Sequence, residues 1–285
     1  MLSARTTFHT GCAQRRRRSR GERNWPEIPV VRHAPDSPTG PTSVNLILFE
    51  APLPETLLRG GDPRARHVRD VLRRRPGDTF DCGAIDGPRG KATVVADTAE
   101  GLRLRFAWES APPPPLDPIV LLVGLPRPQT ARKILREATA LGLSRFRFFA
   151  SGRGEPGYAA SSLWRGDAVR RLLIEGAEQA FCTRLPEVAL HASLSEALEA
   201  EATANATRVA LDNYEAPRGL GALPAEPHTP VIVAVGSERG WTADERDSLR
   251  RARFELRHLG PRVLRTETAC VAALAIIRER LGRYR

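Results

Sequence analysis

The stretch Leu259-Gly-Pro-Arg-Val-Leu-Arg-Thr-Glu-Thr-Ala269 stands directly before an apolar run. Its Gly-Pro pair predicts a turn, and its Thr-Glu-Thr predicts the capped start of a helix over 267–281. Arg262 and Arg265 precede that helix start, where positive charge is unfavourable because the helix dipole is positive there. A helix cap explains the threonines but not the arginines. An anionic or electron-rich ligand would explain both.

A second unusual loop follows the apolar run 231–235, which predicts a buried strand. Gly236-Ser-Glu-Arg-Gly240 leads through Trp241 into Thr242-Ala-Asp-Glu245, the pattern of a capped helix start. The two glycines let the backbone approach a ligand closely beside a helix N-terminus, although a plain strand-to-helix loop also fits them. In open parallel sheets, ligands bind where loops leave the carboxyl ends of strands. Both loops are therefore candidate ligand-binding elements.

Strands and helices alternate around these two loops. Apolar runs without polar alternation, separated by amphipathic helices, indicate an α/β fold with a parallel sheet covered on both faces. The sequence predicts strands over 119–123, 145–149, around Val188, 208–211 and 231–235. It predicts helices over 131–141, 164–181, 243–252 and 267–281.

The chain before residue 118 has a different pattern. Residues 44–110 predict a small β-rich domain with strands over 44–49, 79–82, 91–95 and 102–108. Within it, residues 64–75 predict a short amphipathic helix with a basic outer face and with apolar positions at Val68, Val71 and Leu72. A proline run makes residues 111–117 a linker, and a second domain is expected over 118–285.

Residues 1–43 combine a block of arginines with scattered prolines. This composition predicts a disordered tail, because like charges repel and proline breaks any periodic pattern. A nucleic-acid arm or a targeting peptide is one interpretation of the segment. A mis-assigned start of the gene, with the true start near Val44, is the other.

Composition and charge limit the function classes. The 285 residues hold 44 Lys+Arg against 33 Asp+Glu, a net charge of +11. A basic chain is compatible with a nucleic-acid partner, although many basic proteins bind no polyanion. The longest apolar runs are too short to span a bilayer, and the four cysteines are too far apart for a zinc site or a disulfide framework. We therefore expect a cytoplasmic protein with neither a metal nor a membrane partner.

The stretch 259–269 resembles, almost letter for letter, the C-terminal signature of the bacterial 16S rRNA uridine-N3 methyltransferases, the RsmE family of the SPOUT class. The loop 236–240 resembles that family's Gly-Pro-Glu-Gly-Gly loop. Weaker matches follow in order along 44–285, at 67–73, 76–78, 138–143, 177–179 and 184–186. The resemblance implies a SPOUT-type parallel sheet with a C-terminal trefoil knot, preceded by a small PUA-like β-barrel domain. It also implies a homodimer that uses S-adenosyl-L-methionine to methylate 16S rRNA of the small ribosomal subunit.

The resemblance assigns residues to the two ligands. Those implied to bind the cofactor are Leu211, Gly236, Glu238, Gly240, Leu259, Gly260, Leu264, Thr266 and Thr268. Those implied to bind RNA are Arg66, Arg69, Arg73 and Arg132.

Methylation of uridine at N3 requires removal of a proton and stabilisation of the negative charge that results. The uracil N3–H is a weak acid, so a catalyst must help to remove its proton and must stabilise charge on O2 and O4. A guanidinium suits this task, and we nominate Arg265 first and Arg262 second, with Glu267 to receive the proton. Both arginines also fit a phosphate contact or an ion pair with Glu238 or Glu267, and Glu267 also fits a helix cap.

Two residues of the loop 236–240 depart from the family pattern. Ser237 stands where the family has proline, and Arg239 stands where it has a glycine. These departures leave two further functions open: a non-catalytic RNA-binding or ribosome-assembly protein on the same fold, and a methyltransferase for another RNA nucleotide. Trp241, beside the glycine loop, is either a packing residue or a cover for a ligand.

Overall fold

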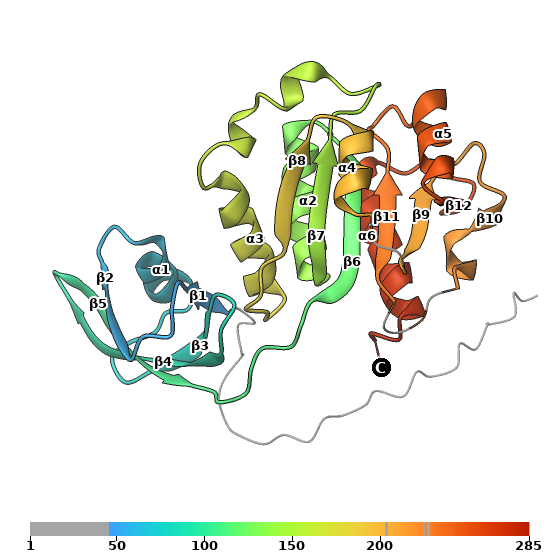
Figure 1. The fold of residues 1–285 in the computed structure, drawn as a ribbon. Helices are drawn as coiled ribbons and strands as arrows, with labels where there is room; N and C mark the ends of the chain where they lie inside the picture. The colour runs from blue at the N-terminus through green and yellow to red at the C-terminus, as the bar shows by residue number, and fades with distance from the viewer. Residues whose placement is uncertain (1–45, 203–204, 225, 227–228, 285) are drawn as a thin grey trace, which may run out of the picture. The chain divides into compact units, whose positions relative to one another are not determined.

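The computed structural model describes residues 46–202, 205–224, 226 and 229–284. The tail expected over 1–43 lies outside the described residues, as do the first two residues of the strand expected over 44–49. The described chain contains a five-stranded and a seven-stranded β-sheet (Figure 1). No helix among the described residues combines the length and the apolar composition that a bilayer crossing requires.

The five-stranded sheet contains the β-rich segment predicted before residue 110. Its order is β1-β3-β4-β5-β2, with β1 parallel to β3 and the other pairs antiparallel. Its strands are β1 Ile47–Phe49, β2 Glu55–Arg59, β3 Thr79–Ala84, β4 Arg89–Thr98 and β5 Gly101–Trp108. Strand β2 was not predicted, because only one of its five residues is buried and its sequence lacks a clear apolar alternation.

The helix of this segment is shorter than the expected 64–75. It begins at α1 Pro63–Arg66, with Asp62 as its cap, and continues as one π-helical turn over His67–Val71. The wider turn changes which side chains face the sheet. Val68 is buried as expected, but Val71 is 58% exposed, contrary to its expected inward position.

The seven-stranded sheet confirms the predicted α/β fold, because every pair of neighbouring strands in it is parallel. The order is β10-β12-β9-β11-β6-β7-β8. Its strands are β6 Asp117–Gly124, β7 Leu143–Phe149, β8 Glu187–His191, β9 Thr207–Leu211, β10 Arg218–Gly219, β11 Val231–Val235 and β12 Glu255–His258. Its helices are α2 Pro128–Ala140, α3 Ala168–Gln179, α4 Leu194–Ala200, α5 Ala243–Arg251 and α6 Thr266–Arg280.

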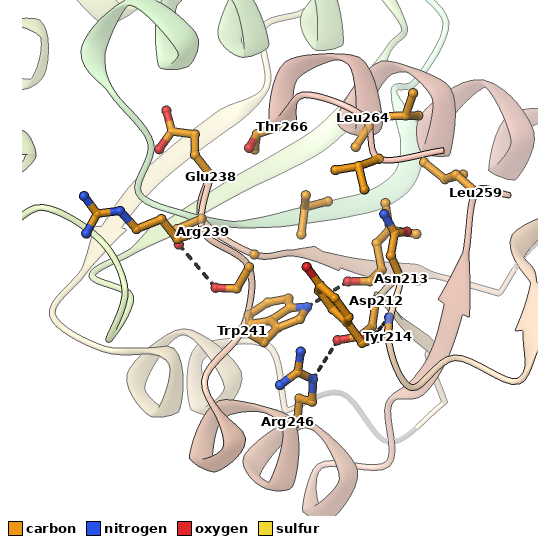
Figure 2. Close-up of a pocket in the computed structure, with 17 residues that line it drawn as sticks. Asp212, Asn213, Tyr214, Glu238, Arg239, Trp241, Arg246, Leu259, Leu264 and Thr266 are labelled. Atoms are coloured by element: carbon orange, nitrogen blue, oxygen red, sulfur yellow. Dashed lines mark hydrogen bonds and ion pairs between the residues drawn. The ribbon is translucent and has the colours of Figure 1, made fainter. Parts of the chain in front are cut away.

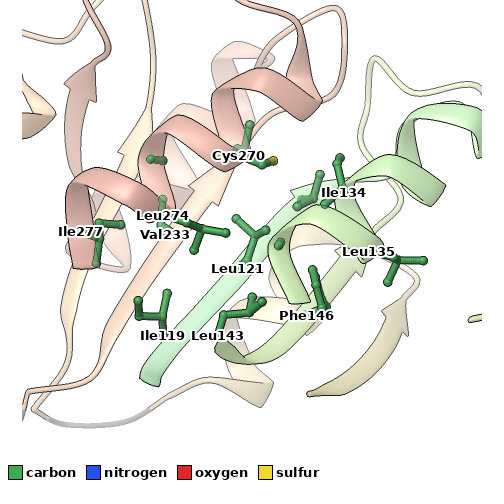
Figure 3. Close-up of a cluster of buried hydrophobic side chains, with 14 of the residues drawn as sticks. Ile119, Leu121, Ile134, Leu135, Leu143, Phe146, Val233, Cys270, Leu274 and Ile277 are labelled. Carbon is green, nitrogen blue, oxygen red and sulfur yellow. The ribbon is translucent and has the colours of Figure 1, made fainter. Parts of the chain in front are cut away.

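Both faces of this sheet are buried, which explains the continuous apolar runs. Leu121 of β6 and Val233 of β11 belong to the core cluster that includes α2 and α6 (Figure 3). The alternating residues Val120 and Ile232 belong to a second cluster, with side chains of α4 and α5. Successive strand residues point to opposite faces, so one apolar run supplies both layers.

Some predicted boundaries differ from the observed ones, and some elements were not predicted. Helix α3 begins at Ala168 instead of 164, since Gly166 has a φ of +60° and Ser162–Trp164 forms a separate short turn. Strand β6 begins at Asp117, inside the expected linker. Helix α4 and strands β10 and β12 were not predicted, although Ser193 is a recognisable cap for α4.

Candidate functional site

Three neighbouring strands end at one edge of the seven-stranded sheet. Strands β12, β9 and β11 are consecutive and parallel, so the loops after them leave the sheet on the same side. These loops, over 212–217, 236–241 and 259–265, line one pocket of about 260 Å³ (Figure 2). The structure therefore brings together both loops that the sequence singled out, and it adds a third.

The loop after β11 is a tight turn that requires its glycines. The Gly240 N–H donates to the carbonyl of Ser237 at 2.8 Å, and Gly240 has a φ of +73°. A Cβ on Gly236 would lie 3.2 Å from the carbonyl carbon of Gly240 and 3.3 Å from the Trp241 ring. The hydroxyl of Ser237 donates to the Gly240 carbonyl at 3.3 Å. Ser237 thus fits within the turn where the family pattern has proline.

Trp241 packs and also lines the pocket. Its side chain is almost completely buried and stacks on Phe149, with 6.0 Å between the ring centroids. The indole Nε1–H donates to the carbonyl of Leu211 at 2.7 Å, which ties the loop after β11 to the end of β9. The predicted helix start at Thr242 is confirmed as a reciprocal capping box with Glu245.

The loop after β9 adds a buried ion pair that the sequence analysis missed. Arg246 of α5 donates from Nε to Oδ2 of Asp212 at 2.7 Å, and Oδ1 accepts from the N–H groups of Tyr214 and Glu215, both at 2.7 Å. Burial acts to raise the pKa of Asp212, but the Glu215 N–H, the Arg246 guanidinium and the Tyr214 N–H outweigh it and hold that pKa below its ordinary value. An acidic residue directly after a parallel strand was the available signal for Asp212.

The loop after β12 completes the pocket. Most residues implied to bind the cofactor line it, and these are Leu211, Gly236, Glu238, Gly240, Leu259, Leu264 and Thr266. Gly260 and Thr268 do not line it. Gly260 has a φ of +108° and shapes the turn after β12. Thr268 lies two residues after Thr266 on α6, and residues two apart do not share a helix face.

A second cavity, of about 500 Å³, adjoins this pocket. It shares with the pocket Glu238, Val263, Leu264 and Thr266, and it is otherwise lined by Arg127, Gln129, Thr130, Lys133, Arg265 and Glu267. Two of the three nominated catalytic residues, Arg265 and Glu267, thus lie together in the second cavity. The third, Arg262, is exposed and lines neither the pocket nor the second cavity. The structure therefore places only one of the two nominated arginines in the second cavity.

The carboxylates of the second cavity pair with Arg127, the cap of α2, and with Lys133 within α2. Glu238 Oε1 accepts from the Arg127 N–H at 2.9 Å and lies 3.6 Å from Arg127 Nε. Glu267 Oε1 lies 3.2 Å from Lys133 Nζ. The N–H at the helix start and then Lys133 hold the pKa of Glu267 below its ordinary value. The alternative ion pairs of Arg262 or Arg265 with these carboxylates are therefore not the ones observed.

Comparison with known proteins identifies the family. A family model described as an RNA methyltransferase domain matches residues 112–278. The chain belongs to this family of RNA methyltransferases. A ribosomal RNA small subunit methyltransferase E from Treponema pallidum is 32% identical over 244 residues, which cover 82% of this chain and 90% of that protein. A ribosomal RNA small subunit methyltransferase E 1 from Borreliella burgdorferi is 26% identical and covers 84% of this chain and 99% of its own length. The sequence resemblance is thereby confirmed.

Solved structures show the same fold. A ribosomal RNA small subunit methyltransferase E from Neisseria gonorrhoeae, bound to S-adenosyl methionine, aligns with a TM-score of 0.69 at 24% identity and covers 82% of this chain and 97% of its own. A probable rRNA methyltransferase from Porphyromonas gingivalis aligns with a TM-score of 0.66 at 20% identity, over 85% of this chain and all of its own.

The four arginines that the family resemblance implied to bind RNA line neither the pocket nor the second cavity. Arg66 and Arg73 are exposed, whereas Arg69 donates from Nε to Asp97 at 3.1 Å. Arg132 is exposed on α2 and lines neither cavity, although the next residue, Lys133, lines the second. Across the described parts of the chain, no group of three or more His, Cys, Asp or Glu side chains could hold a metal ion.

Proposed function

We propose that the chain transfers a methyl group from S-adenosyl-L-methionine to N3 of a uridine in 16S rRNA of the small ribosomal subunit. The main support for this proposal is that the loops 236–241 and 259–265 line one pocket in a chain of the RNA methyltransferase family. The names of the curated relatives and the bound S-adenosyl methionine of a solved relative support methylation of small-subunit rRNA from this donor.

The pocket residues fit the methyl donor. The side chains of Leu211, Leu259 and Leu264 offer apolar surface to an adenine ring, and the turn at Gly236 and Gly240 lets the backbone approach the polar ends of the ligand. Glu238 adds a carboxylate that suits a positively charged sulfonium. The donor supplies an activated methyl carbon when bound, and the protein's task is to align the acceptor with it.

Arg265 has the chemistry to make the acceptor reactive. It lies in the second cavity, beside the pocket assigned to the donor. Removing the uracil N3 proton leaves negative charge on O2 and O4, and a guanidinium stabilises that charge with fixed hydrogen-bond donors. Each unit by which the site lowers the pKa of the uracil is worth about 1.4 kcal/mol. We assign Arg262 no part in this chemistry, because it lines neither cavity.

Glu267 is the candidate proton acceptor. Its lowered pKa keeps it ionised at neutral pH, so it is ready to accept the N3 proton. The same shift makes it a weaker base, and the charge of Arg265 compensates by making the uracil a stronger acid.

The proposal extends to the architecture implied by the family resemblance. We propose that the sheet over 118–285 carries a C-terminal trefoil knot and that two chains associate as a homodimer. We also propose that residues 44–110 form a PUA-like barrel domain, joined by a linker over 111–117. The exposed Arg66 and Arg73 suit this domain to RNA binding.

Nucleoside mass spectrometry of 16S rRNA tests the proposal. A strain that lacks the gene should lose one 3-methyluridine, and the purified full-length protein with S-adenosyl-L-methionine should restore it on small subunits from that strain. Loss of a different methylated nucleoside would show that another nucleotide is the target. If the strain lost no methylated nucleoside, the proposed methyltransferase activity would be contradicted. A non-catalytic RNA-binding protein would also show no donor binding by titration calorimetry.

A further inference from the structure

The second cavity contains more positive than negative side chains. Its cations are Arg127, Lys133 and Arg265, and its carboxylates are Glu238 and Glu267, which leaves a formal charge of +1. Each carboxylate already has a partner, Arg127 for Glu238 and Lys133 for Glu267. The Arg265 guanidinium makes no hydrogen bond or ion pair with another residue in the described part of the chain. The cavity is therefore suited to a ligand with one negative charge.

In the ion pairs of this cavity, the cationic side chains are more exposed to water than the carboxylates. The side chains of Arg127 and Lys133 are 68% and 53% exposed, whereas those of Glu238 and Glu267 are 25% and 17% exposed. An exposed pair contributes little to stability, because water screens the charges and the long side chains lose freedom. Breaking the ion pairs of Arg127 and Lys133 therefore costs little free energy, and both side chains can bind another anion that enters the cavity.

The position of the cavity indicates which anion that is. It shares Glu238, Leu264 and Thr266 with the pocket assigned to the methyl donor. The acceptor nucleotide has to lie beside the donor for the methyl group to be transferred. An RNA strand brings one negative charge with each phosphate, and cations that neutralise phosphates supply much of the affinity for nucleic acid.

We infer that Arg127 and Lys133 bind a backbone phosphate of the RNA beside the target nucleotide. In the free protein they pair with Glu238 and Glu267, and they exchange these carboxylates for the phosphate when RNA enters. Arg265 then remains to face the base. The inference rests on the proposed function, since it assigns the substrate side of the same site, and it adds two residues that the family resemblance did not assign to RNA.

Equilibrium binding of the full-length protein to unmodified small ribosomal subunits, at several salt concentrations, tests this assignment. Lys133→Gln and Arg127→Gln should each weaken binding about tenfold and reduce the slope of log affinity against log salt by roughly one unit. Lys133→Arg should restore both values. The matched control is Arg136→Gln on the same helix, because Arg136 pairs with Glu137 and Glu175 and lines neither cavity.

A second variant separates phosphate binding from a structural ion pair. Glu267→Gln releases Lys133 from its partner and makes the cavity more positive, so the variant should bind the subunits more tightly than the unmodified protein. A purely structural Lys133–Glu267 pair predicts unchanged or weaker binding. Donor affinity, measured by titration calorimetry, should stay the same in the Lys133 and Glu267 variants, because neither residue lines the donor pocket.

The possible outcomes distinguish this inference from the proposed function. Equal affinity and equal salt slope for Lys133→Gln and Arg136→Gln would overturn the phosphate site, as would a weakened donor affinity in Lys133→Gln. The proposed function is judged separately, by the methylated nucleoside that the unmodified protein produces. Methylation of another nucleotide, together with the expected binding differences, would overturn the uridine assignment and support the phosphate site. An unmodified protein that binds no subunits would overturn both.

Discussion

The pocket assigned to the donor and the adjoining second cavity both contain ion pairs, but these pairs differ in their exposure to water. In the pocket, Asp212 and Arg246 have side chains only 1% and 11% exposed, and two backbone N–H groups also bind the carboxylate. In the second cavity, the side chain of Lys133 is half exposed and has one partner among the described residues, Glu267. The first pair is part of the folded structure, whereas the second can change with the ligand.

This difference corresponds to the two tasks of a group-transfer site. A small donor is held well when its pocket is already formed, because little ordering remains to be done on binding. A polyanionic acceptor is held by charges that exchange water, ions and protein partners for phosphate. The comparison predicts that changes in the pocket affect folding, that Arg265 affects turnover, and that Lys133 affects neither folding nor donor binding.

The largest expected effect is on stability, from Arg246→Met. The variant leaves the Asp212 carboxylate buried without its cation, which should lower the free energy of unfolding by roughly 3–5 kcal/mol. Chemical denaturation measures the loss. Arg250→Met is the matched control on the same helix, since Arg250 pairs at the surface with Asp247 and Glu215, and it should change stability much less because water screens an exposed pair.

The pH dependence of that stability has a definite sign. The pKa of Asp212 is lowered in the folded protein, so its contribution is present above the unfolded pKa of about 3.9 and disappears as the pH falls through the lower folded value. The unmodified protein should therefore lose stability below about pH 4. Arg246→Met should lose less there, because its Asp212 keeps the N–H groups of Glu215 and Tyr214 but has lost the Arg246 guanidinium, one of the groups that lower its pKa. Equal acid sensitivity of the two proteins would contradict this account of the pair.

The next largest effect is on turnover, from Arg265→Ala. Removing a preorganised donor that stabilises transition-state charge typically slows the chemical step by about 10²–10³-fold. Single-turnover methylation of small subunits at saturating donor measures the change. Donor affinity by calorimetry should remain within about twofold, because Arg265 lines the second cavity and not the donor pocket. Arg262→Ala is the matched control, and a similar loss in that variant would return Arg262 to the chemistry.

The sequence predicts those parts of the site that depend on short-range patterns. The strand Val231–Val235 has the bounds that its apolar run indicates, and the cap at Thr242 depends on a residue only three positions away. That the loop 236–241 shares a pocket with the loop 259–265 was predictable only from the family resemblance. Strand β12 was missed because Glu255 and Arg257 interrupt its apolar character.

Long-range contacts and the rotation of a helix explain what the sequence analysis missed. Asp212 and Arg246 lie 34 positions apart, and no local pattern connects them. Arg132 was expected to bind RNA, but Lys133 lines the cavity, because each step along a helix turns the side chain by about 100°. A stretch of charged residues therefore predicts a basic helix, but the packing of the buried Ile134 and Leu135 decides which cation faces the site.

The smallest expected effect is on stability, from Lys133→Gln. Because the pair with Glu267 is half exposed, its loss should change the free energy of unfolding by at most about 1 kcal/mol. The pKa of Glu267 should rise toward its ordinary value when Lys133 is removed, since Lys133 is one cause of its lowered pKa in the folded chain. Denaturation at pH 7 beside Arg136→Gln measures the first effect, and NMR titration of the Glu267 carboxyl measures the second. A loss as large as that expected for Arg246→Met would show that the Lys133 pair belongs to the fixed structure, and the contrast between the two cavities would then fail.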